Sequence, residues 1–335
     1  EHGYVNVLKY EEVPEPRISR DEVLIRVKSC ALNYLDIWVR RGLPGIEFSL
    51  PHISGCDIAG VVEQIGVDVE GVKVGDRVVV SPGISCGRCE YCRQGEDSLC
   101  VEYKIIGEHI DGGYAELAKA PGRNLFLIPE HISFEEAAAV PLVFLTAWRM
   151  LVTKAKVKPG EDVLILGAGG GVASAAIQIA KLCGARVFVT ASTDEKLQKA
   201  QELGADVLIN YSKADFDKEI WRLTEKRGVD VVLDNVGAAT WPKSLRSLAK
   251  GGRLVTCGAT TGPLGETDIR YVFWRQLQIL GSTMGNHKEF SEMLKLVWAG
   301  KLKPVIDRVL PLKDAAKAQK LMEQRVQFGK LILKP

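Results

Sequence analysis

The sequence predicts an α/β protein that contains a doubly wound parallel sheet. From residue 163 onward, short apolar strands alternate with amphipathic helical stretches, and six strands joined by crossovers are typical of this architecture. A glycine-rich turn lies directly between the first of these strands and the helix that follows it. The first 140 residues differ, because they read as short strands separated by Gly and Pro, so a second, strand-rich domain is expected.

The elements of the sheet follow one another closely along the chain. Strands are expected at Val163–Leu166, Arg186–Thr190, Val207–Ile209, Val229–Asp234, Arg253–Cys257 and Leu277–Gly281. The first two helices are expected at Gly171–Cys183 and Asp194–Leu203. After about residue 286 the chain reads as helix, strand, helix and strand, at Lys288–Ala299, Val305–Leu310, Asp314–Gln324 and Lys330–Leu333. This C-terminal segment is rich in strands like the first 140 residues, and we expect it to belong to the same domain as they do.

Composition limits the classes of protein to consider. The 335 residues are 46% hydrophobic and 26% charged, which is typical of a globular protein of one large or two ordinary domains. A net charge of +2 gives no support for a nucleic-acid or membrane surface. Glu1 to Tyr4 do not resemble a signal peptide and carry no initiator Met, so we expect some native N-terminus to be missing. The scattered cysteines indicate reduced thiols in a cytoplasmic protein, at Cys30, Cys56, Cys183 and Cys257.

The other four cysteines form a cluster with gaps of two, two and seven residues, at Cys86, Cys89, Cys92 and Cys100. Four thiolates complete the tetrahedron of a structural zinc, and such a closed site leaves no position for catalysis. A ferredoxin-type cluster would need a final gap of three followed by Pro, which this sequence lacks. The cluster therefore predicts one structural zinc, in a lobe formed by residues 86–100.

The glycine-rich turn has the context of a dinucleotide site. It runs from Gly167 to Ala173, and its glycines let the backbone approach a pyrophosphate at the start of a helix. The residues expected to touch the cofactor there are Gly169, Gly170, Gly171 and Val172.

The end of the next strand bears on the choice of cofactor. Ala191 stands where an acidic residue would bind the ribose 2′-hydroxyl of NADH. Ser192, Lys196 and Tyr211 are candidates for binding the 2′-phosphate of NADPH instead. The neighbouring acidic pair, Asp194 and Glu195, weakens the positive field, so NADPH is favoured while NADH stays open.

The chain resembles a medium-chain dehydrogenase/reductase over nearly its whole length. The matching motifs are the glycine turn, the cysteine lobe and the stretches Gly71–Val78, Asp111–Glu116, Asp234–Gly237 and Phe328–Lys330. The resemblance implies a GroES-like barrel domain (residues 1–142 and 286–335) and a Rossmann domain with a six-stranded parallel sheet (residues 143–285). It also implies a homodimer or homotetramer, with the last sheet strand at the dimer contact. Further cofactor contacts are implied at Thr146, Asn235, Gly258, Thr260, Ser282 and Lys330.

The resemblance departs from zinc alcohol dehydrogenases where their catalytic zinc is held. The three ligand positions read Asn33, Cys56 and Leu142, and neither Asn nor Leu is a good zinc ligand. Cys56 is favoured as a small packed thiol, although with Asp57 and His52 it offers an alternative weak metal site. The chain is instead similar to the zinc-free quinone oxidoreductases and enoyl reductases, in Asn33–Asp36, Gly55–Gly60 and Val140–Ala147.

These residues lead to a mechanistic hypothesis. Without a Lewis acid, an activated double bond or quinone is easier to reduce than a simple ketone, so we expect hydride transfer from NAD(P)H to a quinone or α,β-unsaturated carbonyl. Asn33 is the expected donor to the substrate oxygen, with Tyr34 as a further donor and Asp36 orienting them. Alternative roles are helix capping by Asn33, packing by Tyr34 and pairing of Asp36 with Arg40. Alternative functions are an alcohol or aldehyde dehydrogenase without the usual zinc, and a non-enzymatic NADPH-binding protein.

Overall fold

The computed structural model describes residues 1–43, 45 and 48–335. The chain divides into two compact units, one formed by Glu1–Leu145 with Gly285–Pro335 and the other by Thr146–Met284. The C-terminal segment thus belongs to the first unit, as its strand-rich texture predicted. Among the described residues, no helix combines the length and the apolar character needed to cross a membrane.

The second unit contains a six-stranded sheet in which every neighbouring pair is parallel. Its strands are β8 (Asp162–Ile165), β9 (Arg186–Ala191), β10 (Val207–Asn210), β11 (Val229–Asp234), β12 (Leu248–Thr256) and β13 (Gln278–Gly281). Their spatial order is β10-β9-β8-β11-β12-β13, which is the 3-2-1-4-5-6 order of a Rossmann fold. The fold predicted from the alternating pattern is therefore confirmed.

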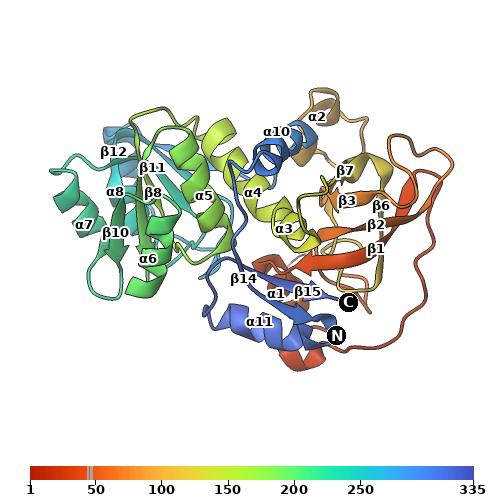
Figure 1. The fold of residues 1–335 in the computed structure, drawn as a ribbon. Helices are drawn as coiled ribbons and strands as arrows, with labels where there is room; N and C mark the ends of the chain where they lie inside the picture. The colour runs from red at the N-terminus through yellow and green to blue at the C-terminus, as the bar shows by residue number, and fades with distance from the viewer. Residues whose placement is uncertain (44, 46–47) are drawn as a thin grey trace. The chain divides into compact units, whose positions relative to one another are not determined.

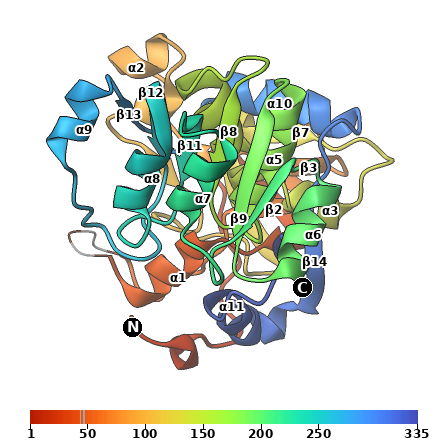
Figure 2. The same ribbon diagram turned by 90° about the vertical axis from the view of Figure 1, so that its left-hand side faces the viewer.

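Helices cover this sheet because each crossover must return to the same edge. They are α5 (Gly171–Leu182), α6 (Asp194–Glu202), α7 (Phe216–Leu223), α8 (Trp241–Ser247) and α9 (Ile269–Trp274). Apolar residues of β8, β9 and β11 pack with those of α7 and α8 in one buried core, including Leu164, Phe188, Ile220, Val232 and Leu245. Figure 2 shows α9 beside the terminal strand β13.

The first unit is dominated by a mostly antiparallel sheet of order β14-β15-β1-β2-β3-β7, with β6 also paired to β1 (Figure 1). The strands are β1 (Glu22–Ala31), β2 (Asp57–Ile65), β3 (Arg77–Val80), β6 (Leu117–Pro121), β7 (Leu125–Leu127), β14 (Ile306–Pro311) and β15 (Lys330–Lys334). Alternating residues of β1, β2 and β3 form its core, including Val23, Ile25, Ile58 and Val78. Strand β15 brings the C-terminus into this sheet by antiparallel pairing with β1.

The remaining elements of the first unit are short. Its helices are α1 (Tyr34–Arg41), α2 (Glu90–Arg93), α3 (Phe134–Ala138), α10 (His287–Trp298) and α11 (Ala315–Glu323), and β4 (Gly83–Ile84) pairs with β5 (Lys104–Ile105). Single turns lie at η1 (Val5–Val7), η2 (Asp97–Leu99), η3 (Gly122–Asn124) and η5 (Leu312–Asp314). The helix α4 (Pro141–Trp148) and the π-helical η4 (Arg149–Lys154) lie where the sequence passes between the units. Helix α1 joins α11 through a buried side chain, because Arg40 donates to Gln319 at 2.7 Å and pairs with Glu323.

Candidate functional site

A buried polar cluster lies at one edge of the sheet in the first unit. Asn33 follows the end of β1, whereas Asp57 and Lys330 are the first residues of β2 and β15. Because β1 is antiparallel to both neighbours, its end lies beside their beginnings, with Ala31 opposite Asp57 and Ile332. Three residues that are far apart in the sequence therefore meet at this edge. With Cys56 they form what we call the Asp57 cluster.

Each hydrogen bond of the Asp57 cluster has good geometry. Lys330 Nζ donates to Asn33 Oδ1 at 2.6 Å and pairs with Asp57 Oδ2 at 3.0 Å. Asn33 Nδ2 donates to the same Asp57 oxygen at 2.9 Å and to Cys56 Sγ at 3.2 Å. The other Asp57 oxygen accepts from the backbone N–H of Leu142 at 2.9 Å. Asp57 and Cys56 are fully buried, so the pairing with Lys330 compensates a carboxylate that would otherwise be costly inside the protein.

A second pair of polar residues is joined to this cluster. Asp36 Oδ2 accepts from the backbone N–H of Asn33 and from the hydroxyl of Tyr114, both at 2.8 Å. Burial raises the pKa of Asp36 to about 6, although these two hydrogen bonds oppose the shift. Asp36 Oδ1 is buried and has no hydrogen-bond partner among the described residues. Asn33 is the N-cap of α1, as the helix-capping alternative stated.

The close approach of Tyr114 depends on a glycine. Gly55 precedes Cys56 and has a φ of 101°, and a Cβ at this position would lie 2.4 Å from the Tyr114 ring. The backbone N–H of Tyr114 also donates to Ser54 O at 2.9 Å. The ring is thereby held against the chain that leads into Cys56 and Asp57, with its hydroxyl aimed at Asp36.

The loop before Tyr114 carries another unusual carboxyl. Glu108 is 7% exposed and accepts no hydrogen bond from the described residues. His109 Nδ1 lies 3.6 Å from the Glu108 carboxylate and already accepts from the backbone N–H of Ile105. Burial raises the pKa of Glu108 to about 7. The carboxyl therefore changes its charge near neutral pH.

The Asp57 cluster does not fit a zinc ion. Leu142 offers no side-chain ligand, and the amide oxygen of Asn33 is already bound by Lys330. Burial raises the pKa of the Cys56 thiol well above its usual value, and the charges of Asp57 and Asp36 add to this shift, which disfavours the thiolate that zinc requires. His52, the other residue of the alternative weak site, places Nε2 3.0 Å from Gly107 O and Nδ1 3.4 Å from Asp111.

The structure also bears on the alternative roles of Tyr34 and Asp36. The Tyr34 ring packs edge-on against Trp38, with ring centroids 5.4 Å apart. The alternative pairing of Asp36 with Arg40 is wrong, because Arg40 instead bonds Gln319 and Glu323, on the side of the helix that faces α11.

In the second unit, the predicted cofactor residues follow the carboxyl ends of the six strands. The glycine turn follows β8, Ser192 follows β9 and Tyr211 follows β10. Asn235 follows β11, Gly258 and Thr260 follow β12, and Ser282 follows β13. In a doubly wound sheet this edge is where a dinucleotide binds. Four of the predicted residues lie within helices: Gly171 and Val172 open α5, Lys196 is on α6 and Thr146 is on α4.

The geometry of this edge fits a dinucleotide. Gly167 has a φ of 69°, and Gly170 N donates to Gly167 O at 2.9 Å, which gives the tight turn from β8 into α5. The N-cap of α5 is Gly170, which has no side chain to bind the first N–H groups, so these remain available for phosphate oxygens. Asn235 Oδ1 and Ser282 Oγ are buried and have no hydrogen-bond partner among the described residues. Both atoms therefore need a partner that a bound cofactor would supply.

The candidate 2′-phosphate site lies at the ends of β9 and β10. Asp194, which was expected to weaken the positive field there, pairs with Lys213 at 2.5 Å and accepts from Asn210 at 2.7 Å. Ser192 accepts from Ser212 Oγ through its backbone oxygen, so its own hydroxyl is not needed in that contact. Tyr211 is 45% exposed and lies beside Ala191, whose carbonyl accepts its backbone N–H.

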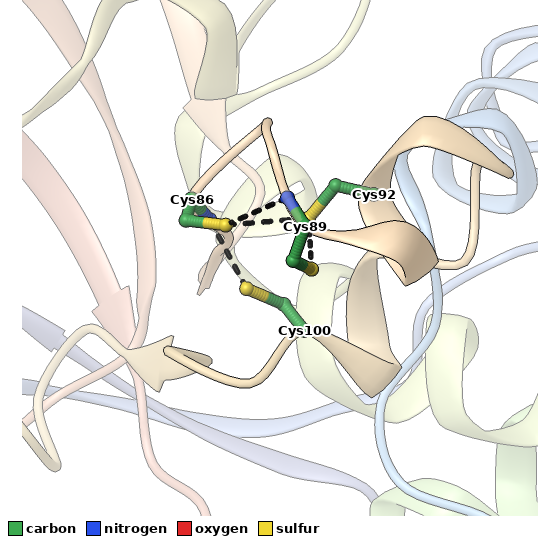
Figure 3. Close-up of side chains that lie close together, drawn as sticks. All are labelled: Cys86, Cys89, Cys92 and Cys100. Carbon is green, nitrogen blue, oxygen red and sulfur yellow. Dashed lines mark hydrogen bonds between the residues drawn. The ribbon is translucent and has the colours of Figure 1, made fainter.

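The four clustered cysteines converge on one point of the first unit (Figure 3). Their sulfur atoms all lie within 4.8 Å of one another, and Cys89 Sγ and Cys86 Sγ lie 3.5 and 3.9 Å from Cys92 Sγ. Tetrahedral zinc–thiolate bonds of about 2.3 Å would place the sulfurs about 3.8 Å apart. Hydrogen bonds from the backbone, first of all from Cys92, lower the pKa of Cys89 to about 6. The arrangement therefore fits a four-thiolate zinc.

Hydrogen bonds attach this cysteine lobe to the rest of its unit. Asp97 accepts from Ser85 Oγ at 3.3 Å and from the backbone N–H of His287, the first residue of α10, at 3.2 Å. The guanidinium of Arg123 donates to Ser85 O. These hydrogen bonds fix the position of residues 86–100 against α10 and the neighbouring loops of the same unit.

Comparison with known proteins agrees with this architecture. A protein-family model described as "Alcohol dehydrogenase GroES-like domain" matches residues 19–130, and a second family model, described as "Zinc-binding dehydrogenase", matches residues 171–299. An acryloyl-coenzyme A reductase of Sulfurisphaera tokodaii is 33% identical over 98% of this chain and 96% of its own. An NAD-dependent alcohol dehydrogenase of Sulfolobus acidocaldarius is 34% identical over 99% of this chain and 98% of its own. A crystal structure of an NAD-dependent alcohol dehydrogenase superposes with a TM-score of 0.96 at 49% sequence identity, and the match covers 100% of this chain and 98% of that one.

Fold and site together define an NAD(P)-dependent oxidoreductase made of a GroES-like and a Rossmann domain. The chain belongs to the zinc-type alcohol dehydrogenase family of medium-chain dehydrogenases/reductases. The non-enzymatic alternative is therefore set aside.

The sequence did not indicate two polar residues of the first unit: Tyr114, which joins the site, and Glu108, in the loop before it. Tyr114 was noted within a family motif, but nothing in its spacing indicates that its hydroxyl reaches Asp36, 78 residues away. Glu108 gave no signal beyond being an acidic residue between apolar Ile106 and Ile110. Lys330 was expected at the cofactor, and its Nζ lies in the Asp57 cluster.

Proposed function

We propose that this protein is an NADPH-dependent reductase of α,β-unsaturated carbonyl compounds or quinones that works without a catalytic zinc. The observation that carries the proposal is the Asp57 cluster, where an amide, a protonated thiol and a lysine ion pair stand in place of metal ligands. The relative named acryloyl-coenzyme A reductase supports an unsaturated thioester as one substrate.

The proposed chemistry matches what these residues can do. Bound NADPH supplies the hydride, and conjugation of the carbonyl with the double bond spreads the resulting charge. We propose that Asn33 and Asp36 position the cluster. Asn33 was predicted to donate a hydrogen bond to the substrate. In this arrangement it has no spare N–H for that role, because Nδ2 already donates to Asp57 and Cys56. Tyr34 as a donor stays a prediction.

We propose NADPH as the preferred cofactor. Ala191 carries no carboxylate to bind a ribose hydroxyl, and the pairing of Asp194 with Lys213 reduces the negative field near Ser192 and Lys196. One relative is named an NAD-dependent alcohol dehydrogenase, so NADH is the cofactor with which NADPH should be compared.

We also propose one structural zinc at the cysteine cluster and a homodimer formed through β13. Among the described residues, no strand pairs with the outer edge of β13, and large apolar side chains are exposed on α9 beside it, at Ile269, Phe273 and Trp274. Light scattering after gel filtration should give a mass of at least two chains. The cytoplasmic location stays a prediction.

A substrate panel tests the proposal. NADPH oxidation should be fast with a small enone, an acryloyl thioester or a quinone. The second candidate, an alcohol dehydrogenase, is favoured by the names of several relatives. Faster reduction of NAD(P)⁺ by ethanol or benzyl alcohol than oxidation of NADPH by any unsaturated carbonyl would select that candidate.

A further inference from the structure

The Asp57 cluster contains one hydrogen-bond donor that its neighbours do not consume. Asn33 Nδ2 donates to Asp57 and Cys56, and the Leu142 N–H donates to Asp57. The Tyr114 hydroxyl donates to Asp36, and the Cys56 thiol lies 3.7 Å from Asp57 Oδ1. An ammonium group has three N–H bonds, and Lys330 uses two of them within the described part of the chain, to Asn33 and Asp57.

The same contacts hold this donor in a fixed place. The Lys330 side chain is 4% exposed, and its two acceptors belong to Asp57, the first residue of β2, and Asn33, which follows β1 as the N-cap of α1. A buried, prepositioned donor stabilises a developing negative charge more than a solvated one, because it needs no reorganisation. The Asp57 carboxylate is itself bound by Asn33 and Leu142, so it anchors Lys330 without occupying all of its protons.

We propose that Lys330 is a catalytic residue whose Nζ donates a hydrogen bond to the carbonyl oxygen of the substrate. This inference rests on the proposed reductase function and names the group that replaces a Lewis acid. Bound reduced nicotinamide would supply the hydride: one of its C–H bonds would break as a C–H bond forms at the β-carbon, and the π electrons of the double bond would move toward the carbonyl oxygen. The Lys330 N–H stabilises that oxygen as an enolate, and a proton from water then forms the C–H bond at the α-carbon. The nicotinamide is oxidised and the double bond reduced by two electrons.

The principal test compares Lys330→Ala with wild type and with Lys334→Ala. Lys334 lies on the same strand, is exposed and pairs with Glu135, so it controls for loss of a lysine from β15. With an enone, kcat of Lys330→Ala should fall about 100-fold, as expected for the loss of one oxyanion donor. The Kd for NADPH, measured by protein fluorescence, should change less than about threefold, and ethylammonium should restore part of kcat where propanol does not.

A second variant guards against loss of fold. Lys330→Ala leaves the Asp57 charge unpaired, whereas Lys330→Met combined with Asp57→Asn removes both charges and should fold. That double variant should show the same fall in kcat. Unchanged kcat in a folded variant would overturn the inference, and so would a large rise in the NADPH Kd with kcat unchanged, which would make Lys330 a cofactor residue. If wild type reduces no enone or quinone, the proposed function itself fails.

A metal titration adds a readout that does not depend on turnover. With Lys330 bound to Asn33 and Asp57, wild type in excess Co²⁺ should take up metal at the four-cysteine cluster alone. Cobalt–thiolate absorption should then be unchanged in Cys56→Ser. Loss of one equivalent of cobalt in Cys56→Ser would show that a metal, and not Lys330, is the cation of the cluster.

Discussion

The buried carboxyl of Asp36 makes the stability of the first unit depend on pH. Its pKa is about 6 in the folded protein and about 3.8 when unfolded, so ionisation costs the folded state up to about 3 kcal/mol. A raised folded-state pKa means that the stability is fully present below pH 3.8 and is lost as pH rises through 6. Tyr114, Asn33, Lys330 and Asp57 face this carboxyl, and their net effect is already contained in that pKa.

The substitution Asp36→Asn should remove this loss. The amide oxygen still accepts from Tyr114 and from the Asn33 backbone, but no charge is buried. Relative to wild type, the variant should gain about 1.4 kcal/mol in free energy of unfolding between pH 5 and pH 8. Urea denaturation followed by tryptophan fluorescence at the two pH values measures this change.

A matched control is Asp21→Asn, at an exposed carboxyl of the same unit. Its difference from wild type should stay within about 0.5 kcal/mol at both pH values. A stability difference between Asp36→Asn and wild type that is equal at pH 5 and pH 8, or that falls as pH rises, would show that ionisation of Asp36 does not destabilise the fold.

Three further predictions follow from other parts of the molecule. Glu108→Gln should gain about 2 kcal/mol over wild type between pH 5 and pH 8 in the same denaturation assay, because the raised pKa of Glu108 makes its ionisation costly; a constant difference contradicts this. Metal analysis should find about one zinc per chain, lost in Cys100→Ser with a lower Tm and retained in Cys183→Ser; zinc retention by Cys100→Ser refutes the site. Lys196→Ala should weaken NADPH binding about 10-fold and leave NADH unchanged, whereas Lys199→Ala, one turn further along α6, should affect neither; equal effects on both cofactors would retire the 2′-phosphate assignment.

The Rossmann unit could be predicted closely from the sequence because its signals are local. The glycine turn, the apolar strands and the change of residue type at Ala191 all lie within short segments, and the parallel order follows from the crossovers. The cysteine spacing is equally local, and the sulfur positions agree with it.

The Asp57 cluster could not be predicted in the same way. Its central ion pair joins residues 273 positions apart, and it forms only because β15 returns from the far end of the chain to pair with β1. The sequence identified Asn33 as a polar residue in a critical place, but not that Lys330 would bind its amide oxygen. The burial that raises the pKa values of Asp36 and Glu108 likewise arises only from packing between distant segments.

Whether the active site works without zinc is tested by NADPH oxidation with an enone and an acryloyl thioester, measured on protein whose zinc content is known. We expect turnover with about one zinc per chain, and no second zinc that a chelator removes together with activity. A preparation that binds two zincs, oxidises alcohols, loses that activity on chelation and leaves unsaturated carbonyls untouched would contradict it.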